Sequence, residues 1–230
     1  MRGINYTLEN KIDPLSEGEK DIIEKAPPLT STDWSKDSYN VIKQRIKGEL
    51  LLHQFDRCAY CRKELEAAGK YEPLEHIVPK TEKPTWMLIP KNLALCCDRC
   101  NNLKNDNKIL APTFEADTIL PEISEAYLIF HPHFDNWGDH FEFEEDIFIV
   151  AKTDDKGKQT IKSCQLYRFN VIINRAKELR MNQKQPMYLI SKRMKMLYGT
   201  NNLNSAALFS ELTNALDHFI ARVQDDDHYN

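Results

Sequence analysis

Two cysteine pairs constrain the fold of this chain more than any other feature of its sequence. Cys58-x-x-Cys61 and Cys97-x-x-Cys100 are short turns that each bring two thiolates within reach of one ion. Tetrahedral zinc takes four such donors at about 2.3 Å, and four thiolates leave no position open for water. We therefore predict a structural zinc site. Cys96 is an alternative to Cys97, but the pair Cys97 and Cys100 has the usual spacing.

Two other interpretations of the cysteines are weaker. Redox catalysis is disfavoured because no thioredoxin-like βαβ pattern surrounds either pair. Ordinary buried thiols remain an alternative, and we assign that state to Cys96 and Cys164. Clustered reduced cysteines are typical of the cytoplasm, where we expect this protein. The N-terminus lacks the apolar core of a signal peptide, and no apolar run approaches the roughly 18–20 residues that span a bilayer.

The charge distribution is uneven along the chain. The net charge of −4 and the pI near 6.0 argue against a uniformly basic nucleic-acid binder. Residues 111–155 nevertheless carry twelve acidic side chains and one lysine, whereas residues 156–195 carry eleven basic side chains and one glutamate. Such asymmetry can mark a nucleic-acid face and a partner-binding or shielding face. The alternative is two solvated surfaces that neutralise each other on folding, and both interpretations stay open.

The hydrophobic pattern predicts an α+β fold, in which a zinc-stapled core is flanked by N-terminal and C-terminal helices and a small β-hairpin. The expected segments are a tether and helix at 1–55, the core at 56–110, a mixed acidic segment at 111–165, and a helical region at 166–230. Periodic apolar residues predict helices at 16–25, 33–54, 168–181, 186–198 and 204–223. EDIFIVA, DDKG and KQTIK predict the hairpin, with Gly157 at a position that needs positive φ.

The insert between the cysteine pairs contains more than a zinc ribbon needs. In order, the chain reads CAYC, EHIVP, NLALCCDRC and NNLK. This ordered set resembles the signature of the HNH, or ββα-metal, endonucleases. The resemblance implies a nuclease core, and it assigns the general base to His76, metal ligands to Glu75 and Asn101, and support of the base-carrying loop to Asn92. Two positions depart from the commonest pattern: an Asn stands at 101 where His is usual, and a Glu at 75 where Asp is usual.

The chemistry of phosphodiester hydrolysis fits these residue types. A neutral imidazole such as that of His76 can deprotonate water near pH 7. Glu75 and Asn101 offer the hard oxygen donors that Mg²⁺ or Mn²⁺ prefers, and two protein ligands leave room for waters and phosphate oxygens. Lys104 and Arg99 are candidates for contacts with flanking phosphates. A solvated charged helix face explains the same two residues.

Features outside this core extend the resemblance. Trp34, the sequence LLHQF before CAYC, and the run HPHFDNWGDHF are similar to the HNH subunits of Septu-type (PtuB-type) and retron-associated anti-phage defence systems. The resemblance implies a nuclease effector, with nucleic acid as substrate and an ABC/SMC-like, PtuA-type ATPase as partner, and no membrane association. The alternatives are a zinc-binding scaffold without activity and a stand-alone restriction-type endonuclease. We interpret HPHFDNWGDH as a packed loop, because no second half with metal-ligand spacing accompanies it.

Overall fold

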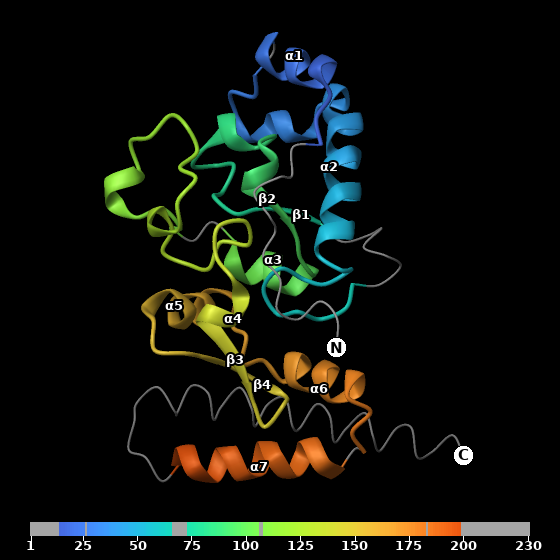
Figure 1. Cartoon of the computed structure of the whole chain (residues 1–230), viewed down its shortest axis with the longest axis vertical. Coiled ribbons are helices and arrows are strands. Elements are labelled where there is room, and N and C mark those ends of the chain that lie inside the picture. Colours follow the sequence, from blue (N-terminus) through green and yellow to red (C-terminus); the bar gives the residue numbers. More distant parts are fainter. Residues whose placement is uncertain (1–13, 26, 66–72, 106–107, 183, 199–230) are drawn as a thin grey trace, which may run out of the picture. The chain divides into compact units, whose positions relative to one another are not determined.

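The computed structural model describes residues 14–25, 27–65, 73–105, 108–182 and 184–198 (Figure 1). The chain divides into two compact units: Met1–Glu142 with Val150–Leu166, and Phe143–Ile149 with Tyr167–Asn230. In the described residues, helices combine with two small two-stranded sheets, which confirms the predicted α+β class. The division into four sequence segments stays a prediction.

Helix α1, Glu17–Lys25, begins with a capping box. The hydroxyl and the backbone N–H of Ser16 both donate to the Glu19 carboxylate, and the Glu19 N–H donates back to the Ser16 hydroxyl oxygen. Glu19 also accepts a hydrogen bond from Arg45 at 2.8 Å, which links α1 to the next helix. The helix predicted at 16–25 is therefore confirmed.

Helix α2, Asn40–His53, packs one apolar stripe against the core of the first unit. The stripe consists of residues four positions apart: Ile42, Ile46 and Leu50. The helix begins later than predicted, because the preceding residues form two 3-10 turns, Ser31–Ser35 and Asp37–Tyr39. Lys36 separates these turns with an extended backbone (ψ 132°), which a continuous helix cannot accommodate.

The strands that carry the predicted motif form a short antiparallel sheet. Strand β1 is Leu74–His76 and strand β2 is Leu93–Leu95, and the two pair in register along their whole length. Two proline-led 3-10 turns, Pro84–Trp86 and Pro90–Asn92, lie in the connection between them. Helix α3, Asp98–Lys104, follows β2 almost directly. In Figure 1, α2 runs beside this sheet.

The predicted β-hairpin is wrong in its second strand. Helix α4, Trp137–His140, leads into strand β3, Phe141–Glu144, which pairs with β4, Phe148–Ala151. The strand predicted in EDIFIVA thus pairs with the segment before it and not with KQTIK. Glu145 and Asp146 turn the chain with φ of 48° and 67°. Asparagine or aspartate followed by glycine usually marks such left-handed turns, so the pair Glu145–Asp146, which lacks a glycine, carried only a weak turn signal.

The segment predicted as the second strand forms helix α5, Asp155–Cys164. Asp154 caps it, because its carboxylate accepts the N–H of Gly157 at 2.9 Å. Gly157 does not have the predicted positive φ. A Cβ atom at this position would lie 2.7 Å from the backbone oxygen of His140, so close backbone approach is what requires glycine.

The described part of the second unit contains two further helices, α6 at Phe169–Glu178 and α7 at Lys184–Tyr198. They confirm the helices predicted at 168–181 and 186–198, with boundaries shifted by a few residues. The helix predicted at 204–223 lies outside the described residues.

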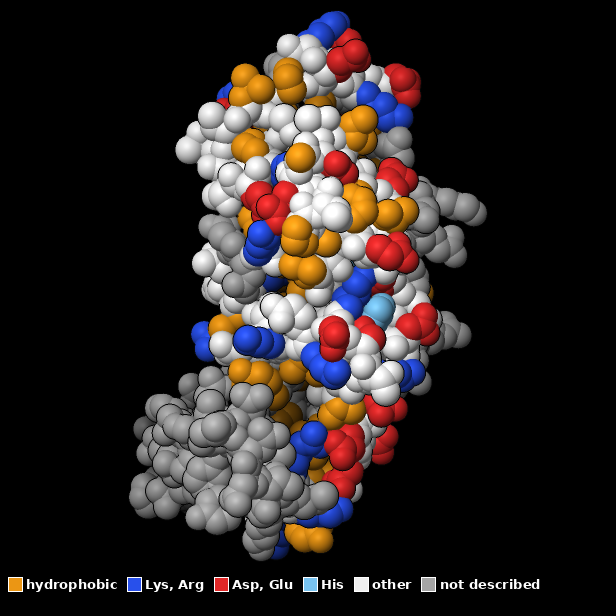
Figure 2. Space-filling model, turned by 90° about the vertical axis from the view of Figure 1, so that its left-hand side faces the viewer, with side chains coloured by type: hydrophobic (Ala, Val, Ile, Leu, Met, Phe, Trp, Pro, Cys, Tyr) orange, Lys and Arg blue, Asp and Glu red, His pale blue; other side chains and the backbone are white. Residues whose placement is uncertain are grey.

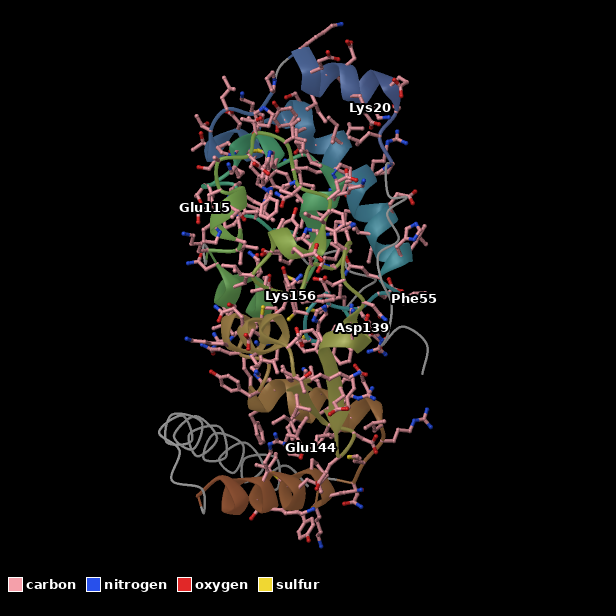
Figure 3. All side chains as sticks on the ribbon, turned by 60° about the vertical axis from the view of Figure 1, so that its left-hand side comes forward. Lys20, Phe55, Glu115, Asp139, Glu144 and Lys156 are labelled. Atoms are coloured by element: carbon pink, nitrogen blue, oxygen red, sulfur yellow. The ribbon has the colours of Figure 1, made fainter. Side chains whose placement is uncertain are left out.

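Opposite charges of the second unit pair with each other at the hairpin turn. Three cationic side chains reach it: Lys192 contacts Glu145, Arg193 contacts Glu144 (labelled in Figure 3), and Arg175 donates to the backbone oxygen of Asp146. Figure 2 likewise shows acidic and basic side chains lying beside one another on the face that it displays. In the second unit, the acidic side chains of residues 111–155 and the basic side chains of residues 156–195 therefore neutralise each other, as the second interpretation of the charge distribution predicts. Each exposed pair contributes at most about 1 kcal/mol.

Candidate functional site

Four cysteine thiols meet in the first unit. All four are buried, and their sulfur atoms lie within 4.8 Å of one another: Cys58, Cys61, Cys97 and Cys100. The Sγ atoms of Cys61 and Cys97 are 3.8 Å apart. A tetrahedron of sulfurs about 2.3 Å from a central ion has edges of about 3.8 Å. The donor set and its spacing therefore fit a metal ion such as zinc.

The local backbone explains how these thiols converge. In the first pair, the N–H of Arg62 (φ 60°) closes a tight turn onto the Cys58 carbonyl at 3.1 Å. Cys97 is the N-cap of α3, and Cys100 lies in the first turn of that helix. Cys96 lies outside the group of four, so the choice of Cys97 by spacing agrees with the structure.

Strand β1 carries the acid–imidazole pair into the protein interior, where Glu75 is 5% and His76 is 8% exposed. The Nε2 atom of His76 lies 3.2 Å from the backbone oxygen of Met87. Because a carbonyl only accepts, Nε2 carries the proton. Among the described residues Nδ1 has no hydrogen-bond partner, which leaves its lone pair free. Burial and, secondly, the charge of Lys80 lower the pKa of His76 to about 3.

Lys104 of α3 supplies the counter-charge of Glu75. Its Nζ atom lies 2.6 Å from Oε1 of Glu75 and 3.0 Å from the backbone oxygen of His76, and its side chain is fully buried. Burial raises the pKa of Glu75 to about 7, and the Lys104 ammonium limits that rise. The Lys104 ammonium thus contacts Glu75 and the His76 backbone oxygen within the protein. A contact of Lys104 with a phosphate stays a prediction.

Asn92 ties down the chain that follows His76. Its Oδ1 atom accepts the N–H of Val78 at 2.8 Å, and its Nδ2 atom donates to the backbone oxygens of Val78 and Trp86 at 3.1 and 3.3 Å. The residue is completely buried. These contacts have the pattern that a supporting role requires, since they hold both ends of the connection between His76 and Met87.

Helix α3 brings the remaining predicted residues to the same region. Asn101 lies one turn before Lys104, so the two side chains share a helix face. Asn101 is half-buried, and its side-chain amide makes no hydrogen bond to the described residues. Arg99 is exposed to solvent. Contacts of Arg99 with nucleic acid stay a prediction.

Lys80 directly follows the stretch EHIVP and was assigned no role from the sequence. It lies inside a turn in which the Pro79 oxygen accepts the N–H groups of Glu82 and Lys83. For His76, its positive charge adds to the larger effect of burial in lowering the pKa. For Glu75, burial raises the pKa, and the charge of Lys80 opposes that rise less strongly than Lys104 does. Within the described part of the chain Lys80 makes no ion pair or hydrogen bond. The position of a basic residue directly after the motif is the sequence signal that could have identified Lys80.

The loop HPHFDNW braces the site. His133 Nε2 donates to the backbone oxygen of Leu93 at 2.8 Å, and Leu93 lies opposite His76 in the sheet. Trp137 Nε1 donates at 3.3 Å to the backbone oxygen of Tyr60, which lies inside the first cysteine pair. One packed loop therefore holds both the motif sheet and a cysteine turn.

A charged cluster anchors this loop to α5. The Asp135 carboxylate accepts the backbone N–H of His131 at 2.7 Å and the ammonium of Lys156 at 3.0 Å. Lys156 is labelled in Figure 3 near the start of α5. His140 completes the cluster, with Nδ1 2.6 Å from Asp154 and Nε2 3.6 Å from Asp135.

The substitution His140→Gln is expected to destabilise the protein more at pH 5.5 than at pH 9. Hydrogen bonding to Asp135 and then to Asp154, against the effect of burial, raises the pKa of His140 above its usual value. Its stabilising effect is therefore complete below the unfolded pKa of about 6.5 and is lost as pH rises through the folded value. We expect a loss of about 1–3 kcal/mol at pH 5.5, measured by urea unfolding. An equal loss at both pH values would contradict this assignment.

Comparison with known proteins supports part of the predicted resemblance. No protein-family model matches the chain. Over 78 residues it is 36% identical to the Septu protein PtuB of Bacillus thuringiensis. The aligned region covers 32% of this chain and 30% of that protein, so the likeness extends over less than a third of either. A PtuB-like relationship is confirmed for this region. None of the helices in the described ranges is both long enough and apolar enough to cross a bilayer.

Proposed function

We propose that this chain is a metal-dependent HNH endonuclease that hydrolyses the phosphodiester bonds of nucleic acid, with DNA the favoured substrate. The observation that carries the proposal is the state of His76. Its imidazole is oriented through Nε2 by a backbone oxygen, has no hydrogen-bond partner on Nδ1 among the described residues, and directly follows the buried Glu75 in strand β1. A neutral, oriented imidazole is what a general base for water requires.

In the proposed reaction, Nδ1 of His76 takes the proton of the attacking water. A pKa of about 3 keeps the imidazole neutral at pH 7, so it is able to accept that proton. The phosphate of a bound substrate places negative charge beside the ring, which raises its pKa and increases its basicity. The hydrogen bond to Met87 holds the ring, and Asn92 holds the chain around it.

Glu75 and Asn101 are the residues that would hold Mg²⁺ or Mn²⁺. Their carboxylate and amide oxygens are hard donors. Two observations fit this assignment: the Asn101 amide has no partner among the described residues, and Glu75 already faces a buried cation, the Lys104 ammonium. When bound, the divalent ion supplies positive charge against the negative charge that develops on the phosphate.

Zinc is the metal that we propose for the four cysteines. Four thiolates leave no open coordination position, so the role of this ion is to hold α3 and the first cysteine turn together. Because α3 carries Asn101 and Lys104, the zinc thereby sets their position relative to β1.

Lys80 is proposed to contact the phosphate at the cut. In a His76→Ala background, which preserves the substrate, Lys80→Ala is expected to weaken DNA binding and to lower the slope of log K against log salt by about 0.9. Lys158→Ala is a matched control, because this lysine is exposed on α5 and pairs with Asp155. A slope for the Lys80 variant equal to that of its parent would exclude the contact.

We further propose that the chain is the effector subunit of an anti-phage defence complex with an ABC/SMC-like, PtuA-type ATPase, including complexes of the retron-associated kind. The partial similarity to a Septu protein supports this setting. Copurification of the ATPase with the chain would distinguish this setting from a stand-alone restriction-type endonuclease.

An inactive zinc-binding scaffold is the second candidate. The ion pair between Lys104 and Glu75 favours it, since the ammonium already supplies a counter-charge to the proposed metal ligand. The two functions differ in a direct assay. The purified chain, alone and with the ATPase, would be incubated with plasmid, single-stranded DNA and RNA in the presence of Mg²⁺, Mn²⁺ or EDTA. Cleavage that requires the divalent ion supports the nuclease, and its absence under every condition supports the scaffold.

A further inference from the structure

The 3-10 turn Ser31–Ser35, which precedes the predicted nuclease core, is firmly built. The Asp33 carboxylate accepts the backbone N–H groups of Leu29 at 2.8 Å and Thr30 at 3.2 Å. It also pairs with Lys36 at 3.0 Å. Hydrogen bonding to Leu29 and then to Lys36 lowers the pKa of Asp33 to about 2, so the carboxylate stays charged across the physiological range.

Trp34, within this turn, is held by Lys43 of α2. Lys43 donates to the backbone oxygen of Trp34 at 2.9 Å, and its ammonium also lies 5.1 Å from the centroid of the indole ring. The lysine therefore restrains both the backbone and the side chain of Trp34. A half-buried aromatic residue that is held in this way has a defined orientation toward its next neighbour.

That neighbour is His76. The ring centroids of Trp34 and His76 are 4.4 Å apart, and the ring planes are inclined by 76°. Such edge-to-face packing is a favoured arrangement of aromatic rings. Within the described part of the chain, the imidazole makes one hydrogen bond, from Nε2 to the backbone oxygen of Met87. A single hydrogen bond leaves a ring free to swing about it, so a second contact is needed to define where Nδ1 points.

We infer that Trp34 is a positioning residue, which holds the His76 ring on the Met87 oxygen so that Nδ1 stays available for catalysis. This inference rests on the proposed nuclease function and deepens it. The site then includes a segment that lies well before the motif in the sequence. A fragment restricted to residues 56–110 would lack this contact.

The test compares Trp34→Ala, Trp34→Phe and wild type in cleavage assays. Trp34→Ala is expected to lower kcat about 10- to 100-fold, with KM within about twofold of wild type, because a displaced base affects chemistry more than binding. Trp34→Phe keeps an aromatic ring and is expected to restore most of kcat. Tyr188→Ala is the matched control, because Tyr188 is an aromatic residue of α7 that is 67% exposed. Wild-type kcat in Trp34→Ala would overturn the inference.

A second measurement separates this inference from the nuclease proposal. The ¹⁵N signals of the His76 ring, assigned with a His76→Ala variant, report its tautomer without any substrate. We expect the Nε2–H form in wild type and Trp34→Phe, and averaged signals in Trp34→Ala. If wild type cleaves nothing, the nuclease proposal fails and this spectrum alone decides the role of Trp34. Unchanged ring signals in Trp34→Ala would overturn the inference, whatever the activity.

Discussion

His76→Ala is expected to reduce nucleic-acid cleavage about 10²- to 10⁴-fold, the usual contribution of a general base. The variant removes the only group that we place at the attacking water. It leaves the four cysteines and the supporting contacts of Asn92 in place. Metal content should therefore remain close to that of wild type.

The matched control for this variant is His53→Ala. His53 lies in the last turn of α2 with a side chain that is 44% exposed, and its Nε2 atom lies 3.7 Å from the carboxylate of Glu49 in the same helix. The control should cleave at the wild-type rate. Both proteins would be assayed with Mg²⁺ and with EDTA, in the presence and absence of the ATPase. Cleavage by His76→Ala at the wild-type rate would show that His76 is not the general base.

The second large effect is expected from Cys100→Ala. This change removes one of four converging thiols and leaves a metal site with three ligands. A bound metal present at about 1,000 times its dissociation constant contributes about 4 kcal/mol to the free energy of unfolding, and the variant should lose a contribution of this size. Cleavage should also fall, because Cys100 lies on the helix that carries Asn101 and Lys104.

Zinc content and the free energy of unfolding would be measured on the same samples. Cys164→Ala is the matched control, because Cys164 is equally buried but lies outside the group of four. The control should retain a full equivalent of zinc and lose about 1 kcal/mol or less of stability. Retention of zinc by Cys100→Ala would refute the proposed ligand set.

The helices were the most predictable part of the fold. Ile42, Ile46 and Leu50 recur at helical spacing, and they pack on the core side of α2 as expected. The second strand of the β-hairpin was predicted wrongly. KQTIK alternates like a strand, but the segment forms helix α5 because Asp154 caps the helix N-terminus. The Asp154 carboxylate starts a helix there, and Gly157 is required by the backbone oxygen of His140, a residue distant in the sequence.

The candidate site likewise has features that the sequence predicted and features that it did not. The order of CAYC, EHIVP, NLALCCDRC and NNLK was sufficient to predict which cysteines converge. The roles of Glu75 and His76 stay predictions. Residue order did not indicate that Lys104 is buried against Glu75, since a lysine on a short helix is usually solvated.

Motif residues and amphipathic helices are local properties, because ligand spacing and side-chain periodicity are set by neighbours along the chain. The contacts that orient His76 are of another kind. Trp34 reaches it from before the motif, and His133 braces the opposite strand from after it. No local pattern encodes such pairs, because they form only when packing of the core brings distant segments together. The chemical groups of the site could therefore be read from the sequence, whereas their orientation, burial and charge state depend on the folded chain.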